Sequence, residues 1–178
     1  MKQPATPDDC CEVPRPLAEA SGAAQPGPAA TTDRRRCPTS GTVGFKVDLI
    51  TVKALLNAAG LQRLDGRAYR FCPAPDCDVV YFDSDAGSVF RKSHLTVRVG
   101  QKEHSDPIPI CYCFGYTAAD IRRDLALRDT TDIPAIITEQ VKAGHCACEV
   151  KNPQGSCCLG NVSRLVKSVR SDASASRK

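Results

Sequence analysis

The sequence predicts the α+β fold class, with a small hairpin-and-helix module followed by a small three-helix module. Three observations lead to this prediction. Short alternating runs of β-branched and aromatic residues lie before residue 100, whereas apolar residues at helical spacing dominate after it. The 178 residues include eleven cysteines in separated groups. A low aromatic content without Trp limits each module to a small core, which bound metal would supplement.

Composition and charge exclude several classes of protein. The net charge is +4, and the segment from Arg164 to Lys178 accounts for it, with five basic residues against one acidic residue. Such a tail is typical of a solvated end, so we expect no nucleic-acid binding. The N-terminus has no apolar signal region and no apolar run reaches membrane-spanning length, so we expect a cytoplasmic protein. In a reducing cytosol, clustered thiols hold metal more often than they form disulfides.

The two ends of the chain are predicted to lack a fold of their own. Residues 1–36 are rich in Pro, Ala, Gly, Thr and Ser and contain almost no large apolar residues, which predicts a disordered leader. This leader carries Cys10 and Cys11. Two adjacent thiols on a flexible arm would capture a soft ion such as Cu(I), and the alternative is an unstructured pair without metal. Residues 170–178 are predicted to be a disordered basic tail.

The first module is predicted over residues 37–105. Alternating apolar residues predict its strands, and apolar residues at spacings of three and four predict its helix. The predicted elements are a turn at 37–41, a strand at 43–47, a helix at 49–59 ended by Gly60, a hairpin with strands at 79–82 and 88–90, and a strand at 95–99.

Three cysteines of this module are spaced as metal ligands. Cys37 opens the first turn, and Cys72 and Cys77 enclose a second turn with four residues between the two thiols. Small zinc modules assemble four ligands from two such distant loops. The pattern therefore predicts a zinc site in which the sequence identifies three thiol ligands.

The second module is predicted over residues 106–169. Asp106–Pro109 is a stiff connection because each proline fixes its own backbone and biases its predecessor away from helix. Helices are predicted at residues 117–128, at 132–143 with Pro134 in the first turn, and from Leu159 to 169. Their predicted core residues are Ile121, Leu125, Ile136, Ile137, Val141, Val162, Leu165, Val166 and Val169.

Six of the cysteines lie in this second module, beginning with Cys111 and Cys113. Two cysteines one residue apart can place both sulfurs on one iron, and Gly115 lets the backbone approach an inorganic cluster. Thr117 and Asp120 have the spacing of a capping box, so the positive end of the next helix would lie near these sulfurs and suit an anionic cluster. The later thiols are Cys146, Cys148, Cys157 and Cys158. This pattern favours a [2Fe-2S] cluster over a second zinc site, which remains the alternative.

The second module resembles the [2Fe-2S] domain of the CopZ family, which is related to bacterioferritin-associated ferredoxin. The resemblance lies in Cys111-Tyr112-Cys113-Phe114-Gly115, the long helical spacer, Cys146-x-Cys148 and Cys157-Cys158-Leu159-Gly160-Asn161-Val162. The first module resembles the treble-clef-like zinc module that precedes this domain in the family. Together the resemblance covers roughly residues 37–169. It implies bound Zn²⁺ and one [2Fe-2S] cluster.

One position departs from the family pattern. The family's first turn typically supplies two cysteines, whereas here the second position is Ser40, whose hydroxyl is a poor zinc ligand. The fourth ligand therefore stays open between His94, Asp76, a leader thiol and water. His94 follows the hairpin and could fold back, whereas Asp76 is more typical of a turn cap.

Water in the fourth position is the arrangement of a catalytic zinc. The sequence shows no general base for such a zinc, no Ser-His-Asp spacing, no phosphate-binding loop and no paired carboxylates in a plausible pocket. We therefore predict no catalytic residues, and any activity would be redox chemistry at the cluster.

The choice among the cluster thiols rests partly on the resemblance. Cys158 stands directly before a predicted helix, so a cluster bound there also meets backbone N–H groups. The residues alone do not separate Cys146 from Cys148; family spacing favours Cys148 with Cys158, and relatives of bacterioferritin-associated ferredoxin favour Cys146. We predict Cys111, Cys113, Cys148 and Cys158 as ligands. Cys146 and Cys157 would be spare thiols, available for copper or buried as small apolar residues.

The sequence and the resemblance together predict a zinc- and [2Fe-2S]-binding protein of copper homeostasis. The resemblance implies one-electron transfer at the cluster, with reduction of Cu(II) to Cu(I) before delivery to a copper-transporting ATPase. The sequence has no Met-x-Cys-x-x-Cys loop of the family's copper domain, so we expect Cu⁺ to be carried by a separate copper chaperone or by the Cys10–Cys11 pair. The alternatives are a ferredoxin-like regulatory partner of an iron-storage or reductase protein and a purely structural zinc protein. The sequence does not identify the electron donor.

Overall fold

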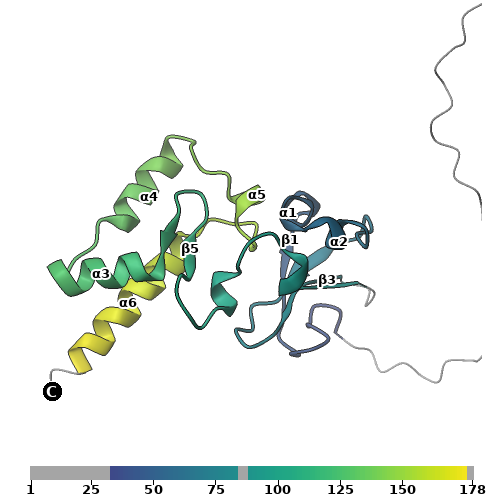
Figure 1. Ribbon diagram of the computed structural model, residues 1–178, viewed down its shortest axis with the longest axis horizontal. Helices are drawn as coiled ribbons and strands as arrows, with labels where there is room; N and C mark the ends of the chain where they lie inside the picture. Colours follow the sequence, from purple (N-terminus) through teal and green to yellow (C-terminus); the bar gives the residue numbers. More distant parts are fainter. Residues whose placement is uncertain (1–32, 84–87, 176–178) are drawn as a thin grey trace, which may run out of the picture. The chain divides into compact units, whose positions relative to one another are not determined.

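The computed structural model describes residues 33–83 and 88–175 (Figure 1). Cys10 and Cys11 of the predicted leader lie outside the described residues. The part of the leader that is described, residues 33–36, is ordered by a turn and by a bridge between Arg36 and Val43, so this part of the prediction is wrong. None of the helices in the described residues has the length and apolar character needed to span a bilayer.

An antiparallel sheet with strand order β1-β2-β3-β4 forms the first part of the fold. The strands are β1 (Phe45–Val47), β2 (Tyr69–Phe71), β3 (Val79–Asp83) and β4 (Val89–Arg91). Phe71 of β2 is the partner of Phe45 on one side and of Tyr81 on the other. Every residue of β3 is buried. The two inner strands therefore supply much of the first core, in which aromatic rings of β2, β3 and β4 pack together.

The predicted helix over residues 49–59 is interrupted. The structure has α1 (Leu49–Leu55) and α2 (Ala58–Leu61), separated by Leu56, whose backbone is extended. The Asn57 side chain accepts a hydrogen bond from the backbone N–H of Gly60 at 3.0 Å and so begins α2. Gly60 lies within α2 instead of ending a longer helix. The periodicity of the apolar residues carried no information on this break, because Leu56 bridges to the distant Leu95 and the N–H of Asn57 donates to the carbonyl of His94.

The predicted strand at residues 95–99 is absent from the described structure. The backbone N–H and the hydroxyl of Thr96 both donate to the carbonyl of Leu55, and Leu95 forms an isolated bridge with Leu56. The segment therefore hydrogen-bonds to the end of α1 and does not join the sheet. It is flanked by two 3₁₀ turns, η1 (Lys92–His94) and η2 (Gly100–Lys102).

The second part of the fold begins with a short antiparallel pair, β5 (Pro109–Cys111) and β6 (Tyr116–Thr117), and continues in helices. The helices are α3 (Ala118–Arg128), α4 (Ile133–Lys142), α5 (Cys148–Lys151) and α6 (Leu159–Ala175). Thr117 and Asp120 form the predicted capping box of α3, and Pro134 lies in the first turn of α4 as predicted. The predicted mixture of helix and sheet is thus confirmed.

The apolar faces of α3, α4 and α6 meet in a second core (Figure 1). Ile121, Leu125, Ile137 and Val162 are buried there as predicted, whereas Ile136 is 40% exposed and is not part of it. Helix α6 begins at Leu159 as predicted but continues to Ala175, so residues 170–175 are helical and not a disordered tail. The described residues of both parts belong to one compact unit.

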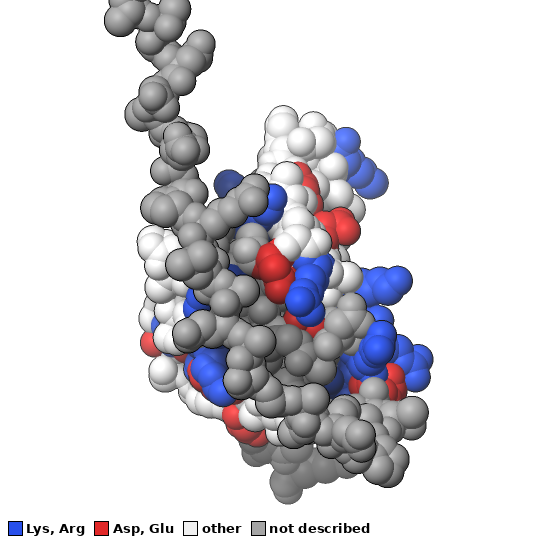
Figure 2. Space-filling view, turned by 90° about the vertical axis from the view of Figure 1, so that its right-hand side faces the viewer, with Lys and Arg blue, Asp and Glu red and all other residues white. Residues whose placement is uncertain are grey.

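Charged side chains of both signs lie on the surface of this unit. On the face that Figure 2 shows, acidic side chains lie next to several of the basic ones. The ion pairs of the structure follow this pattern; Arg98, for example, donates to Glu103 at 2.6 Å. Such exposed pairs contribute little to stability, about 0–1 kcal/mol each.

Gly100→Ala is expected to lower the free energy of unfolding by at least about 2 kcal/mol. A Cβ at this position would overlap the backbone carbonyl oxygen of Pro109, so the backbone would have to move. Chemical denaturation measures the change. Gly66→Ala is the matched control, because a Cβ at Gly66 meets nothing within 4 Å. Equal stability of the two variants would contradict the prediction.

Candidate metal centres

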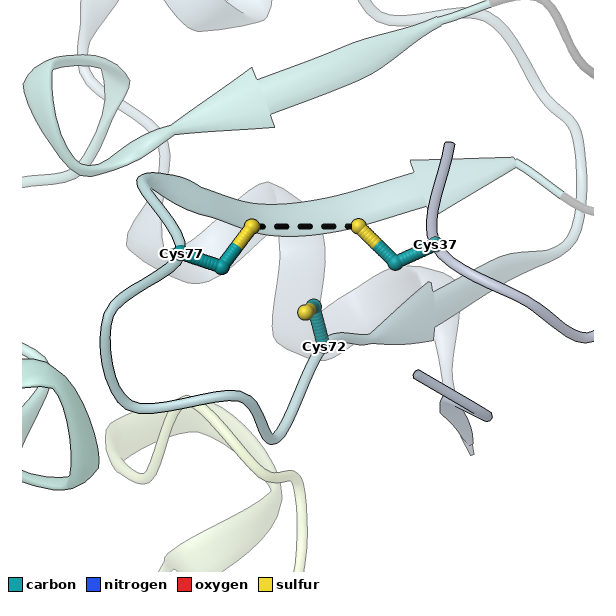
Figure 3. Close-up of side chains that lie close together, drawn as sticks. All are labelled: Cys37, Cys72 and Cys77. Carbon is teal, nitrogen blue, oxygen red and sulfur yellow. Dashed lines mark hydrogen bonds between the residues drawn. The ribbon is translucent and has the colours of Figure 1, made fainter. Parts of the chain in front are cut away.

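Cys37, Cys72 and Cys77 converge on one point near the end of β2 and the start of β3 (Figure 3). Their sulfur atoms all lie within 4.8 Å of one another, and those of Cys37 and Cys77 are 3.9 Å apart. Cys37 precedes β1, Cys72 directly follows β2, and Cys77 ends the turn before β3. All three side chains are buried. The structure thus brings together the three thiols that the sequence predicts as zinc ligands.

The turn after Cys37 directs backbone N–H groups toward its sulfur. The carbonyl of Cys37 accepts from the N–H of Gly41 at 2.8 Å, and Gly41 has φ +69°, which favours glycine. Burial raises the pKa of the Cys37 thiol, but hydrogen bonds from Ser40 and Thr39 outweigh it and hold that pKa below its ordinary value. Burial raises the pKa of Cys72 above its ordinary value. The turn is therefore built to stabilise a thiolate at Cys37.

Ser40 is the residue that the structure places beside the three thiols. Its hydroxyl oxygen lies 3.3 Å from the sulfur of Cys72. His94 is held elsewhere: Nδ1 accepts from the backbone N–H of Arg91, and Nε2 lies 2.9 Å from a guanidinium nitrogen of Arg63. Asp76 is exposed and lies 3.2 Å from His104. The structure brings neither His94 nor Asp76 into the group, and the leader thiols Cys10 and Cys11 lie outside the described residues. Of the described side chains, Ser40 is the one next to the open fourth position, which water could also take.

Lys102, which no pattern in the sequence singled out, lies next to this group. Its side chain is 1% exposed, and Nζ donates to the carbonyls of Ala74 at 2.8 Å and Cys77 at 3.0 Å. The ammonium also lies over the Phe71 ring, 5.8 Å from its centroid. Burial lowers the pKa of Lys102, and negative charge on the three thiols acts in the opposite direction. A lysine in the polar run Gly-Gln-Lys-Glu carries no sequence signal of burial.

The first group fits a zinc ion. Tetrahedral zinc with Zn–S bonds of about 2.3 Å places its sulfurs about 3.8 Å apart. The 3.9 Å between the sulfurs of Cys37 and Cys77 matches this spacing without rearrangement. Three thiols with one adjacent hydroxyl therefore provide a donor set for Zn²⁺.

The second set of thiols forms two pairs. The sulfurs of Cys113 and Cys148 are 3.6 Å apart, and the thiol of Cys158 lies close enough to that of Cys111 to lower its pKa. The Cys-x-Cys spacing allows Cys111 and Cys113 to share one iron, whereas the structure places each of them close to a later thiol. Cys146 and the exposed Cys157 lie outside both pairs.

The arrangement in pairs differs from that of a mononuclear site. A four-thiolate zinc would draw all its sulfurs to within about 4 Å of one another. Among the described residues, only Cys37, Cys72 and Cys77 form such a group of three. The two pairs instead match a cluster with two metal ions, each of which takes two thiolates.

Backbone N–H groups lie near the sulfurs of Cys111 and Cys113. The N–H of Ala147 donates to the sulfur of Cys113 at 3.3 Å, and the N–H groups of Cys113 and Phe114 act to lower the pKa of Cys111. The thiol of Cys158, followed by these N–H groups, lowers the pKa of Cys111 to about 6. Burial raises the pKa of Cys148 to about 12, and the Cys111 contact raises that of Cys158. The N–H groups favour negative charge at this site.

The loop between Cys148 and Cys158 is supported by the first part of the fold. The Tyr81 hydroxyl on β3 donates to the carbonyl of Pro153 at 2.9 Å, and the amide of Gln101 donates to Gln154 at 2.7 Å. Within the loop, buried Asn152 donates to the carbonyl of Ser156 at 2.6 Å. The positions of Cys148 and Cys158 therefore depend on the sheet.

The turn that carries Cys111 and Cys113 has a similar anchor. The hydroxyl of Tyr112 accepts from the N–H of Gly100 at 2.8 Å and donates to the carbonyl of Arg98 at 3.0 Å. Gly100 belongs to η2, the turn that also carries Lys102. The supports of the two candidate metal centres thus meet at η2.

Tyr81→Phe is expected to accelerate loss of metal from the second group and to destabilise the fold by about 1–3 kcal/mol, because the buried Pro153 carbonyl loses its donor. The measurement is the decay of any visible cluster absorption at fixed denaturant concentration. Tyr69→Phe is the control, because its hydroxyl bonds to Asp65 at 2.6 Å, away from the cluster loop. Equal decay rates of the two variants would show that the Pro153 contact has no specific role.

Comparisons with known proteins agree with this geometry. Residues 34–96 match a zinc binding domain of CopZ type. The curated copper chaperone CopZ of Archaeoglobus fulgidus is 34% identical over 143 residues, which are 80% of this chain and 67% of the relative. The X-ray structure of the N-terminal domain of that organism's CopZ has a TM-score of 0.62 and 34% identity, and the match covers 73% of this chain and 96% of the solved one.

Proposed function

The chain belongs to the CopZ family, and from that premise we propose that it holds one Zn²⁺ and one [2Fe-2S] cluster and serves copper homeostasis by one-electron transfer. The similarity to a copper chaperone supports the choice of copper. We place this activity in the cytoplasm because clustered free thiols persist under reducing conditions. The proposed division is a zinc module over residues 37–105 and a three-helix cluster module over residues 106–169.

Zinc would be held by Cys37, Cys72 and Cys77. These residues lie within the matching zinc binding domain and converge on one point. Ser40 or a water molecule would complete the tetrahedron. Because all three thiols are buried, the ion would stabilise this part of the fold instead of catalysing a reaction.

The cluster would be held by Cys111 with Cys158 on one iron and by Cys113 with Cys148 on the other. The single observation that carries this proposal is the approach of the Cys113 and Cys148 sulfurs to 3.6 Å, beside which Cys158 acts on the pKa of Cys111. A bound [2Fe-2S] cluster supplies reversible one-electron chemistry. Cys113 is only half-buried, so this end of the site is open to an electron donor or to Cu(II).

In the proposed reaction a reduced cluster held by these four thiols would supply the one electron that converts Cu²⁺ to Cu⁺. The product ion needs soft ligands. Candidate acceptors are Cys146 and Cys157, the Cys10–Cys11 pair, a separate copper chaperone or a copper-transporting ATPase. The electron donor would be a separate reductant.

Anaerobic purification with metal analysis and a visible spectrum tests the two sites. We expect about two irons and one zinc per chain. Cys113→Ala should lose iron and colour and keep zinc, whereas Cys72→Ala should lose zinc. Cys157→Ala is the control and should keep both, because its exposed thiol lies outside every group. Zinc without iron from cells with intact cluster assembly would overturn the redox function and leave a structural zinc protein.

The copper reaction has its own test. Chemically reduced protein, freed of excess reductant, is mixed with Cu(II) and a chromophoric Cu(I) chelator. About one Cu(I) per cluster should form, because the reduced cluster gives up one electron. Unchanged reduced protein after mixing would contradict the role in copper reduction and would favour a ferredoxin-like partner of an iron protein.

A further inference from the structure

Lys102 is a buried cation without a carboxylate partner. Among the described residues, none of the ion pairs includes it, although its side chain is 1% exposed. Its two hydrogen-bond acceptors, the carbonyls of Ala74 and Cys77, are neutral. A buried charge normally requires an opposite charge close by, since desolvation costs several kcal/mol.

The other charged side chains near Lys102 already have ion-pair partners. Asp76, Asp78, Lys92 and His104 line the same groove as Lys102. Asp76 lies 3.2 Å from His104 and Asp78 lies 3.5 Å from Arg91. Lys92, 40% exposed, pairs with Glu103. The three thiols are therefore the anionic groups that remain to balance Lys102.

The charge of a metal complex at these thiols supports this assignment. A divalent ion with three thiolates and a neutral fourth ligand has one net negative charge. The position that would add a fourth thiolate is occupied by Ser40, which is uncharged. One ammonium beside the complex then makes the whole site neutral, which is the state of lowest cost in a buried environment.

We propose that Lys102 is the counter-charge of the three-thiolate zinc site and that, with Ser40 in place of a fourth thiolate, it makes the buried zinc complex electrically neutral. This inference rests on the proposed zinc function. Lys102 is a positioning residue here, because it contacts the backbone of the Cys72–Cys77 turn and not the metal.

Lys102→Gln separates charge from hydrogen bonding, because the amide keeps a donor for the two carbonyls. Zinc affinity is measured on the purified full chain by competition with a chromophoric chelator. We expect a loss of about 10- to 100-fold, which is the effect of one unit charge roughly 6–12 Å from the complex at an effective dielectric constant near 20. Lys92→Gln is the control; its exposed charge is screened, so affinity should stay within about twofold.

A second pair of variants distinguishes charge from structure. Ser40→Cys adds a fourth thiolate and gives the zinc complex two net negative charges. In the Ser40→Cys background, Lys102→Gln should lower zinc affinity by about the square of the fold-change measured with Ser40 in place. The reason is that the Coulomb energy between the Lys102 charge and the complex doubles. An equal cost in both backgrounds would assign Lys102 a merely structural role and overturn the proposal.

Zinc binding by the wild-type chain shows whether the proposed zinc function fails or only the counter-charge role of Lys102. Absence of zinc at Cys37, Cys72 and Cys77 in wild type would overturn both. Tight zinc binding in wild type with unchanged affinity in Lys102→Gln would overturn only the counter-charge. Circular dichroism of each variant shows whether the fold is retained.

Discussion

The contact of the Lys102 ammonium with the carbonyls of Ala74 and Cys77 is the interaction on which both halves of the structure depend. It holds the Cys72–Cys77 turn against η2. Two residues earlier in η2, the N–H of Gly100 donates to Tyr112, which lies between Cys111 and Cys113. One short 3₁₀ turn, η2, therefore supports the Cys72–Cys77 turn of one candidate centre and the Cys111–Cys113 turn of the other. Gly100 has no room for a side chain, because the Pro109 carbonyl lies against it.

The cysteines are core residues as well as candidate ligands. Cys37, Cys72 and Cys77 pack with Val79 and Phe82 in a small cluster of their own. Cys111 and Cys158 are buried with the apolar residues of α3, α4 and α6. Small modules of this size bury little apolar surface, so bound metal would contribute folding free energy directly. The proposed zinc and cluster sites would thus complete the cores that position them.

The direction of support between the two parts also follows from the contacts. β3 supplies Tyr81 to the loop between Cys148 and Cys158, and η2 supplies Gly100 to the loop of Cys111 and Cys113. The cluster thiols are therefore positioned by the part of the fold that carries the proposed zinc site. Zinc bound there would stabilise the geometry of the cluster thiols without contact between the two metal centres.

Local features of the sequence determined the mixture of helix and sheet, the start of α3 at its capping box, the start of α6 at Leu159 and the three thiols of the first group. These depend on neighbours a few residues apart, or on the chemistry of cysteine itself. The break after α1, the loss of a strand at 95–99 and the exposure of Ile136 depend on partners distant in sequence. The pairing of Cys111 with Cys158 and of Cys113 with Cys148 and the burial of Lys102 were likewise decided only by tertiary structure. Spacing along a chain indicates which residues bind metal, but a pair of sulfurs or a buried charge exists only where folding brings segments together.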